Sequence, residues 1–433
     1  MRRFLLMVLA GILGIQLNAG NNSTLPAHVD SVSALSQVFG DGAKVKTIVI
    51  TYDAPIKNSS LKQGTYGVEG KTVLRVYANT VADNAAKGRD GRYVVIELEA
   101  KTDLNAQPKQ PTPADDAKKK ERDKNMGGPG LKAGWSTAGD DVYTDSVSIT
   151  QLLPIKTAKG KTIAASNTPF TATKTHYAVA DDFTQHEFTS PYTGQTLPYN
   201  LYLPKGYDAH KRYPLVLFIH DAGVASSPVR SPLLQGRGAV TWAEPTWQSE
   251  HPCIVVAPQY PVVTVDDDWN YSHHLDATIA LLKDIESKYA VDEDRVYTTG
   301  QSMGCMSSMV LLLKEPHLFA GALLVAGKWQ TSVLGPLAEQ NLWIISCEGD
   351  QSSTEMQNQA VALWRKNGAT VTEATWNMTA PADSLSALAR DMADRGSHLL
   401  YTHLTGGSHR ATWGVAYDIQ GVKEWLFRQR RKQ

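Results

Sequence analysis

Cysteine is scarce in this sequence, with three residues among 433. Cys253 and Cys347 lie in apolar, strand-like runs, and Cys305 follows a glycine-rich turn. An odd number of cysteines in core-like settings argues against a disulfide framework. We therefore expect three small, buried side chains. Their spacing also resembles no zinc site.

Neither sign of charge is in excess, because 43 Lys and Arg balance 43 Asp and Glu. Without a net field, we expect no nucleic acid or other polyanion as a partner. Hydrophobic residues make up 42% and charged residues 20%, which is ordinary for a soluble globular protein. The length indicates about two or three domains.

Long hydrophobic runs are also lacking. An apolar run at residues 4–17 falls short of the ~20 residues that a membrane span requires. Arg2 and Arg3 precede it, and Leu17-Asn18-Ala19 offers a small-residue cleavage site. We predict a signal peptide at residues 1–19 and a secreted or periplasmic protein without a membrane span. A retained N-terminal anchor is the alternative.

Short β-like runs fill residues 25–180, with β-branched and aromatic residues alternating or clustered. No helical period intervenes, so we predict a small immunoglobulin-like β-sandwich. Its runs are residues 45–57, 72–80, 92–100, 145–155 and 175–183. The polar, Pro- and Gly-rich segment 101–134 carries charges of both signs, and we predict a solvated, mobile loop inserted in the sandwich.

From about residue 185 the pattern changes to apolar runs separated by segments of helical period. This alternation is typical of a mostly parallel sheet covered by helices on both faces, so we predict an α/β domain over residues 185–433. The predicted strands are residues 213–220, 253–260, 295–300, 321–327, 342–350 and 399–404. The predicted helices are residues 274–289, 303–314, 354–367 and 420–431. Sites in such sheets form beyond the carboxyl ends of strands.

The pentapeptide Gly300-Gln301-Ser302-Met303-Gly304 lies at such a strand end. Glycine on both sides of the serine permits a tight strand-to-helix turn, because the flanking chain passes close. The turn puts the hydroxyl at a helix N-terminus, where free N–H groups favour a developing negative charge. The pattern predicts that Ser302 is a nucleophile. A serine that merely caps the helix is the alternative.

A serine nucleophile needs a base, and the base needs an acid that orients it. The chain order in α/β-hydrolases is Ser, acid, His. Asp350 ends one predicted strand and His409 follows another, so we expect both at the same edge of the sheet as Ser302. Glu348 is the competing acid, but it lies within the strand end rather than in the loop beyond it.

Acyl transfer also needs N–H donors for the oxyanion. The backbone N–H of Met303, directly after the nucleophile, is one candidate. The second should come from the loop after strand 213–220, with Ala222 as first choice and Asp221 as second. His220 and Asp221 would be a weak metal pair, because no further ligand is clustered nearby.

Four longer motifs accompany these residues: LPYNLYLPKGYDAHKRYPLVLFIHDAG, RGAVTWAEPTWQSEHPCIVVAPQYP, KYAVDEDRVYTTGQSMG and VKEWLF. They resemble the exported α/β-hydrolase esterases that carry an N-terminal immunoglobulin-like domain. The feruloyl-esterase and polyhydroxybutyrate-depolymerase-like group is similar, but less so. The resemblance implies an α/β-hydrolase fold and carboxylester hydrolysis by Ser302, Asp350 and His409, with no metal or organic cofactor.

The sequence departs from that family at several positions. Asp221 stands where a glycine is usual in the oxyanion loop, and Cys305 stands where another glycine commonly follows the nucleophile motif. QSSTE follows Asp350 in place of a proline-rich turn. Residues 372–398 are longer than the usual connection, so this insertion is a candidate to shape or cover the pocket.

Three tryptophans near strand-end loops, Trp242, Trp269 and Trp329, are candidates to line an acyl or aromatic pocket. We expect a secreted serine carboxylesterase that acts through an acyl-enzyme on short-chain acyl or plant-polymer-linked esters. A prolyl-oligopeptidase-like serine peptidase and a non-catalytic binding protein on a hydrolase scaffold are the alternatives. Three roles remain as alternatives for the N-terminal sandwich: binding a glycan, forming an oligomer, or capping the active-site side.

Overall fold

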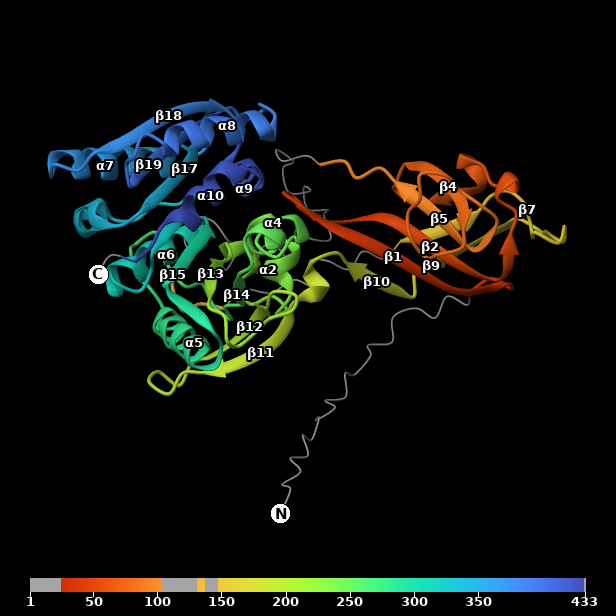
Figure 1. The fold of residues 1–433 in the computed structure, drawn as a ribbon, viewed down its shortest axis with the longest axis horizontal. Coiled ribbons are helices and arrows are strands. Elements are labelled where there is room, and N and C mark those ends of the chain that lie inside the picture. Colours follow the sequence, from red (N-terminus) through yellow and green to blue (C-terminus); the bar gives the residue numbers. More distant parts are fainter. Residues whose placement is uncertain (1–24, 103–130, 137–146, 432–433) are drawn as a thin grey trace, which may run out of the picture. The chain divides into compact units, whose positions relative to one another are not determined.

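The computed structural model describes residues 25–102, 131–136 and 147–431 (Figure 1). The predicted signal peptide lies outside these residues. No helix in the described ranges is long and apolar enough to cross a membrane.

The chain divides into two compact units, and the division does not follow the order of the chain. The first unit holds the described parts of residues 1–32, 49–96 and 146–173. The second holds those of residues 33–48, 97–145 and 174–433. Residues 33–48 therefore group with the C-terminal unit, although the sequence patterns assigned them to the sandwich.

The N-terminal strands form a five-stranded sheet ordered β10-β1-β2-β5-β4, a three-stranded sheet β3-β6-β9 and a hairpin β7-β8. Their bounds are β1 Val29–Phe39, β2 Gly42–Ile56, β3 Tyr66–Val68, β4 Val73–Asn79, β5 Gly91–Leu98, β6 Ser148–Gln151, β7 Ile155–Lys156, β8 Thr162–Ile163, β9 Ser166–Thr171 and β10 Lys174–Tyr177. The buried hydroxyls of Tyr52 and Tyr66 join the first two sheets at 2.7 Å. Burial raises the pKa of Tyr52 to about 12.

The second unit is built on a nine-stranded sheet ordered β11-β12-β14-β13-β15-β16-β17-β19-β18. β11 and β12 are antiparallel, and every pair from β14 to β18 is parallel. The bounds are β11 Thr184–Thr189, β12 Thr196–Tyr202, β13 Tyr213–Ile219, β14 Ile254–Pro258, β15 Val291–Gln301, β16 Gly321–Val325, β17 Leu342–Cys347, β18 Val371–Asn377 and β19 Leu399–Thr405. All residues of β13, β14, β16 and β17 are buried, as expected for strands covered on both faces.

Helices cover both faces of this sheet. α5 His274–Lys288, α6 Met303–Lys314 and α7 Gln351–Lys366 pack on one face in a single hydrophobic cluster. The helices of the opposite cluster are α2 Ser231–Leu234, α3 Arg237–Val240, α4 Pro245–Glu250, α8 Ala382–Ala393, α9 His409–Ala416 and α10 Gln420–Arg428. The α/β-hydrolase fold with a preceding all-β domain, predicted from the sequence, is therefore confirmed.

Residues 372–398 lie in β18, which pairs with β19 at the edge of the sheet, and in α8, which packs against α10. That this insertion shapes or covers the pocket stays a prediction. One sequence-based expectation needs correction. The end of segment 101–134 is not a solvated loop: Leu131 is buried in the core of the second unit, and Gly134 N–H donates to Val263 O at 2.8 Å. Residues 103–130 of that segment lie outside the described residues.

Candidate active site

Ser302 occupies a sharp turn between β15 and α6. Its backbone has φ 53° and ψ −119°, in the left-handed half of conformational space that non-glycine residues rarely adopt. Such strain persists only where the surrounding structure enforces it. Here the Ser302 N–H donates to Val325 O of the next strand at 3.0 Å, while its carbonyl accepts from Met306 N in α6.

The glycines of this turn are required by close backbone approach. A Cβ on Gly304 would lie 1.9 Å from the carbonyl oxygen of Ile219, at the end of the neighbouring strand. A Cβ on Gly300 would lie 2.4 Å from the carbonyl carbon of Gly304. The departure at Cys305 is accommodated differently: its buried side chain lies against Gly327, where a Cβ would come within 2.5 Å.

His409 bridges Ser302 and Asp350. Its Nε2 lies 3.0 Å from Ser302 Oγ, and its Nδ1 lies 2.5 Å from Asp350 Oδ2. Because the carboxylate can only accept, Nδ1–H donates to Asp350 and Nε2 is left to accept from the serine hydroxyl. The structure thus brings together three residues from three strand ends, separated by up to 107 positions in the chain.

Asp350 and Glu348 have different partners. Asp350 is the N-cap of α7, where its Oδ1 accepts from Ser353 N at 3.3 Å. Its side chain is only 12% exposed, so surrounding atoms restrict the carboxylate to its position beside the histidine. Glu348 Oε2 instead accepts from Gly406 N at 2.9 Å, in the loop that leads to His409. The competing acid therefore holds the histidine loop rather than the imidazole.

His220 and Asp221 form no metal pair. His220 is fully buried, donates from Nδ1 to Asp221 O at 2.7 Å, and accepts at Nε2 from Tyr260 N at 3.0 Å. Burial lowers the pKa of His220, so the ring is neutral at pH 7. Both nitrogens are occupied, and no cluster of metal ligands occurs among the described residues.

Two family models match the chain. The model named Esterase covers residues 190–417, more than half of the sequence, and the esterase Ig-like N-terminal domain covers residues 31–164. The chain belongs to this esterase family. It is a carboxylic ester hydrolase with an immunoglobulin-like N-terminal domain.

One solved structure in particular agrees with this assignment. The crystal structure of a thermostable esterase is similar over 93% of this chain and 100% of its own, with 27% identity and a TM-score of 0.69. A feruloyl esterase module from Clostridium thermocellum covers 58% of this chain and 89% of its own, at 14% identity and a TM-score of 0.42. No curated protein matches the sequence.

In this esterase, the backbone N–H groups of Met303 and Ala222 meet no acceptor among the described residues. Met303 begins α6, and Ala222 begins a short 3-10 turn after β13, Ala222–Val224. The two strands are neighbours, with Ile219 opposite Gly300. The Asp221 carboxylate, although only 5% exposed, is fully engaged: Oδ1 accepts from Gly223 N at 2.8 Å and Oδ2 from Gln301 Nε2 at 3.1 Å.

The three tryptophan candidates have different settings. Trp242 is fully buried, stacks on Phe427 and donates to Gly238 O, so the expectation that it lines the pocket is wrong. Trp269 and Trp329 contact each other edge to face, with ring centroids 5.6 Å apart. Trp329 follows Gly327, which lies against the Ser302 backbone, so this pair belongs to the carboxyl edge of the sheet.

Sequence reasoning missed two residues at the carboxyl edge of the sheet. Trp413, one turn beyond His409 on α9, contacts its ring edge to face with centroids 5.3 Å apart. Lys328 Nζ lies 3.1 Å from Asp267 Oδ1 and 2.9 Å from Ser352 Oγ. The contact between Trp413 and His409 could have been predicted, because residues four positions apart lie on one face of a helix.

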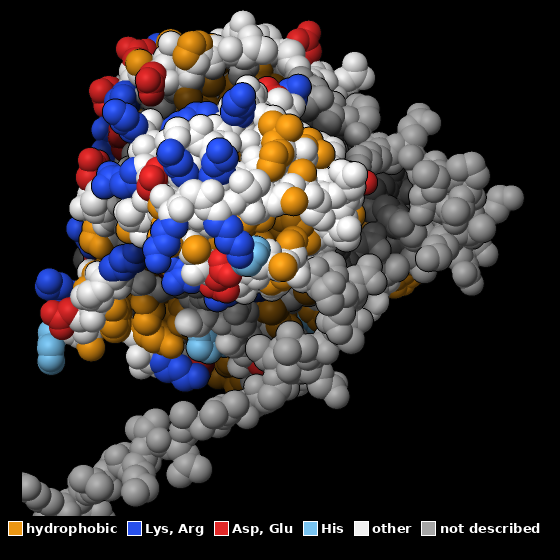
Figure 2. All heavy atoms as spheres, turned by 90° about the vertical axis from the view of Figure 1, so that its right-hand side faces the viewer, with side chains coloured by type: hydrophobic (Ala, Val, Ile, Leu, Met, Phe, Trp, Pro, Cys, Tyr) orange, Lys and Arg blue, Asp and Glu red, His pale blue; other side chains and the backbone are white. Residues whose placement is uncertain are grey.

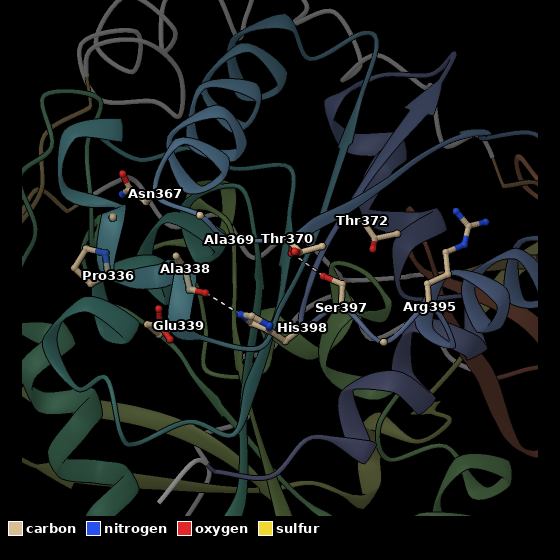
Figure 3. Close-up of a pocket in the computed structure, with 13 residues that line it drawn as sticks. Pro336, Ala338, Glu339, Asn367, Ala369, Thr370, Thr372, Arg395, Ser397 and His398 are labelled. Atoms are coloured by element: carbon tan, nitrogen blue, oxygen red, sulfur yellow. Dashed lines mark hydrogen bonds between the residues drawn. The ribbon is translucent and has the colours of Figure 1, made fainter.

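A cavity of about 740 Å³ lies elsewhere in this unit (Figure 3). Its lining residues lie before or at the start of β17, β18 and β19, at the amino ends of these parallel strands, whereas Ser302 and Asp350 follow carboxyl ends. In it, His398 Nε2 donates to Ala338 O at 2.8 Å and Ser397 Oγ donates to Thr370 O at 2.8 Å (Figure 3). This cavity is therefore not where Ser302, Asp350 and His409 meet.

Proposed function

We propose that Ser302, His409 and Asp350 are the catalytic triad of a serine carboxylesterase that works through an acyl-enzyme. The observation that carries the proposal is the pair of contacts at His409, 3.0 Å to Ser302 Oγ and 2.5 Å to Asp350 Oδ2. Nucleophile, base and orienting acid are within hydrogen-bond reach without rearrangement.

The mechanism follows from these contacts. His409 Nε2 takes the proton of Ser302 as its Oγ attacks the ester carbonyl, and then gives that proton to the leaving alcohol. Water enters, loses a proton to His409, and attacks the acyl-enzyme, which releases the acid and restores Ser302. Asp350 keeps the Nδ1–H tautomer in place and stabilises the imidazolium.

The oxyanion is held by the N–H groups of Met303 and Ala222. Met303 begins α6 directly after Ser302, and Ala222 begins the loop after the neighbouring strand β13. Neither N–H has another acceptor in the part of the chain that the structure describes. Fixed donors of this kind stabilise the developing charge without reorganisation. Asp221 serves this arrangement through its side chain, which caps the turn that carries Ala222.

We assign short-chain acyl or plant-polymer-linked esters as the substrates, on the strength of the family motifs and of the Trp269–Trp329 pair. We assign export because of the positively charged n-region and the apolar run that follows it at the N-terminus. The export assignment is tested by expressing the full chain and sequencing the N-terminus of the protein found in the periplasm or growth medium. We expect that N-terminus to be Gly20.

One substrate panel tests the catalytic proposal: nitrophenyl esters of graded chain length, a feruloyl ester, an acetylated sugar and a proline peptide. Ser302→Ala should lower kcat/KM on every ester at least about 10³-fold, since the nucleophile is lost. Ser287→Ala, an exposed serine on α5, is the matched control and should act as the wild type. Wild-type activity in Ser302→Ala would overturn the assignment, and preference for the proline peptide would favour a peptidase.

A further inference from the structure

The balanced total charge conceals an uneven distribution. In the described residues of the first unit, ten Lys and Arg stand against five Asp and Glu, a net charge of +5. Residues 54–68 and 147–173 contain no acidic side chain at all. The lysines of these two segments are Lys57, Lys62, Lys156, Lys159 and Lys161, which we call the lysine cluster.

Backbone hydrogen bonds bring the two acid-free segments together. Lys57 N–H donates to the carbonyl of Lys156 at 2.8 Å. The N–H groups of Leu152 and Leu153 both donate to the carbonyl of Thr65, at 2.8 and 3.3 Å. The lysine cluster is therefore a single surface rather than two separate stretches of sequence.

The lysines of this surface form no ion pairs among the described residues, and all five are exposed. Two acids lie beside them: Asp53 pairs with His28, which Lys161 Nζ contacts at 3.4 Å, and Asp90 accepts from Asn58 N at 2.8 Å. Five lysines against these two acids leave a net positive charge, which attracts a partner of opposite sign.

Exposed leucines lie within the same surface. Leu74, Leu152 and Leu153 are 48%, 49% and 41% exposed. All three lie beside the 3-10 turn η2 Gln63–Thr65. Leu152 and Leu153 are hydrogen-bonded to Thr65 O through their backbone N–H groups, and Leu74 follows Val73, whose carbonyl accepts from Gln63 Nε2 at 2.8 Å. Figure 2 shows Lys and Arg side chains beside hydrophobic side chains on the face that it presents, with a few acidic and histidine side chains among them.

We propose that this surface, the lysine cluster together with the three leucines, binds an anionic lipid bilayer. The ammonium groups would lie among anionic headgroups, and the leucines would leave water for the interface, as interfacial segments do. The leucines favour a bilayer over a dissolved polyanion, because only the bilayer offers an apolar phase. The esterase domain would then work at a lipid surface, held there by its N-terminal domain.

Co-sedimentation with vesicles tests the proposal. The chain should bind vesicles of phosphatidylglycerol and phosphatidylcholine but not phosphatidylcholine alone, and binding should weaken as salt rises. Lys156→Gln, Lys159→Gln and Lys161→Gln combined should lower the partition coefficient on the order of 100-fold, at about fivefold per lysine. The double variant Leu152→Ser, Leu153→Ser should weaken binding without changing how steeply binding depends on salt, because no charge is removed. Each variant should keep wild-type hydrolysis of a soluble ester, which shows that it is folded.

The matched control is Lys205→Gln, Lys211→Gln and Lys366→Gln, three exposed lysines of the second unit, and it should bind as the wild type. The full chain and a chain starting at Gly20 are both measured, so that the apolar N-terminus is assessed separately. Equal binding by the wild type and the cluster variant overturns the proposal. So does binding to an anionic polysaccharide such as polygalacturonate without binding to vesicles.

Discussion

Gln301 and Asp221 meet in a buried position beside the proposed nucleophile, with Gln301 Nε2 donating to Asp221 Oδ2 at 3.1 Å. Gln301 directly precedes Ser302 on β15, and Asp221 begins the loop that carries the Ala222 N–H. The contact therefore ties the serine turn to the oxyanion loop through two side chains. It also gives the unusual aspartate of this loop a structural role.

Removing this contact should destabilise the protein and slow the reaction. Asp221→Ala leaves the Gly223 N–H and the Gln301 amide without a partner, at a cost of about 2 kcal/mol in the free energy of unfolding. Asp221→Asn should cost less, because its oxygen still caps the turn and the Gln301 amide can rotate to accept from it. Denaturant unfolding and kcat/KM measure both effects. Equal losses for Ala and Asn would contradict this role.

Asp350 and Glu348 provide a matched pair of acids. Asp350→Asn should lower kcat by about 10²–10⁴-fold, because the amide no longer selects the Nδ1–H tautomer of His409. Glu348→Gln keeps an oxygen that can accept from Gly406 N, so its kcat should stay within about threefold of the wild type. Steady-state kinetics on one nitrophenyl ester distinguishes the two. A larger loss at Glu348 would reverse the assignment of the acid.

Gly304→Ala should fail to form the serine turn. The new Cβ would lie 1.9 Å from Ile219 O, and backbone at that position has no room to retreat. We expect a destabilisation of at least about 3 kcal/mol, as for overpacked cores, together with loss of activity. Gly335→Ala is the control, since its Cβ would meet nothing closer than 3.9 Å and should leave the thermal midpoint nearly unchanged. Both midpoints are read by calorimetry.

Lys423 should make stability depend on pH in a specific window. Its side chain is buried, donates to Thr241 Oγ1 at 2.9 Å, and lies over the Trp247 ring. Burial lowers the pKa of Lys423 to about 8, below its ordinary value of 10.5. Between these values the unfolded chain holds a proton that the folded chain lacks, so this lysine's contribution to stability rises with pH from about 8 to 10.5.

The variant Lys423→Met lacks that titration. The free energy of unfolding of the wild type, minus that of the variant, should therefore increase by about 3 kcal/mol across this window and stay flat below it. Taking the difference cancels the contribution of the tyrosines that titrate above pH 10, because both proteins contain them. Urea unfolding at a series of pH values measures it. A difference that does not change with pH would show that Lys423 stays charged in the fold.

Local patterns were sufficient for much of the catalytic unit. Fully buried parallel strands read as continuous apolar runs, so β13 to β17 lie close to where the sequence placed them. Because parallel strands end at one edge, chain order and strand ends together predicted that Ser302, Asp350 and His409 would lie near one another. In contrast, β1 was missed although its burial alternates along the strand, because its polar residues dilute the β signal.

Tertiary contacts decided what periodicity cannot express. Trp242 and Trp329 are both buried, but packing places the first against Phe427 and the second against Trp269 at the carboxyl edge of the sheet. The partners of Asp221 and Glu348 come from 80 and 58 positions away, on other strands and loops. Such pairings depend on where distant segments meet in space.

The sequence by itself determined the fold class and the strand-turn-helix around Ser302, because each rests on neighbours in the chain. The tertiary structure alone decided which acid contacts the imidazole, how Asp221 is held, and that five lysines from two acid-free segments share one surface. These depend on contacts between residues far apart in sequence, and a net charge of zero gives no sign of how charge is distributed in space.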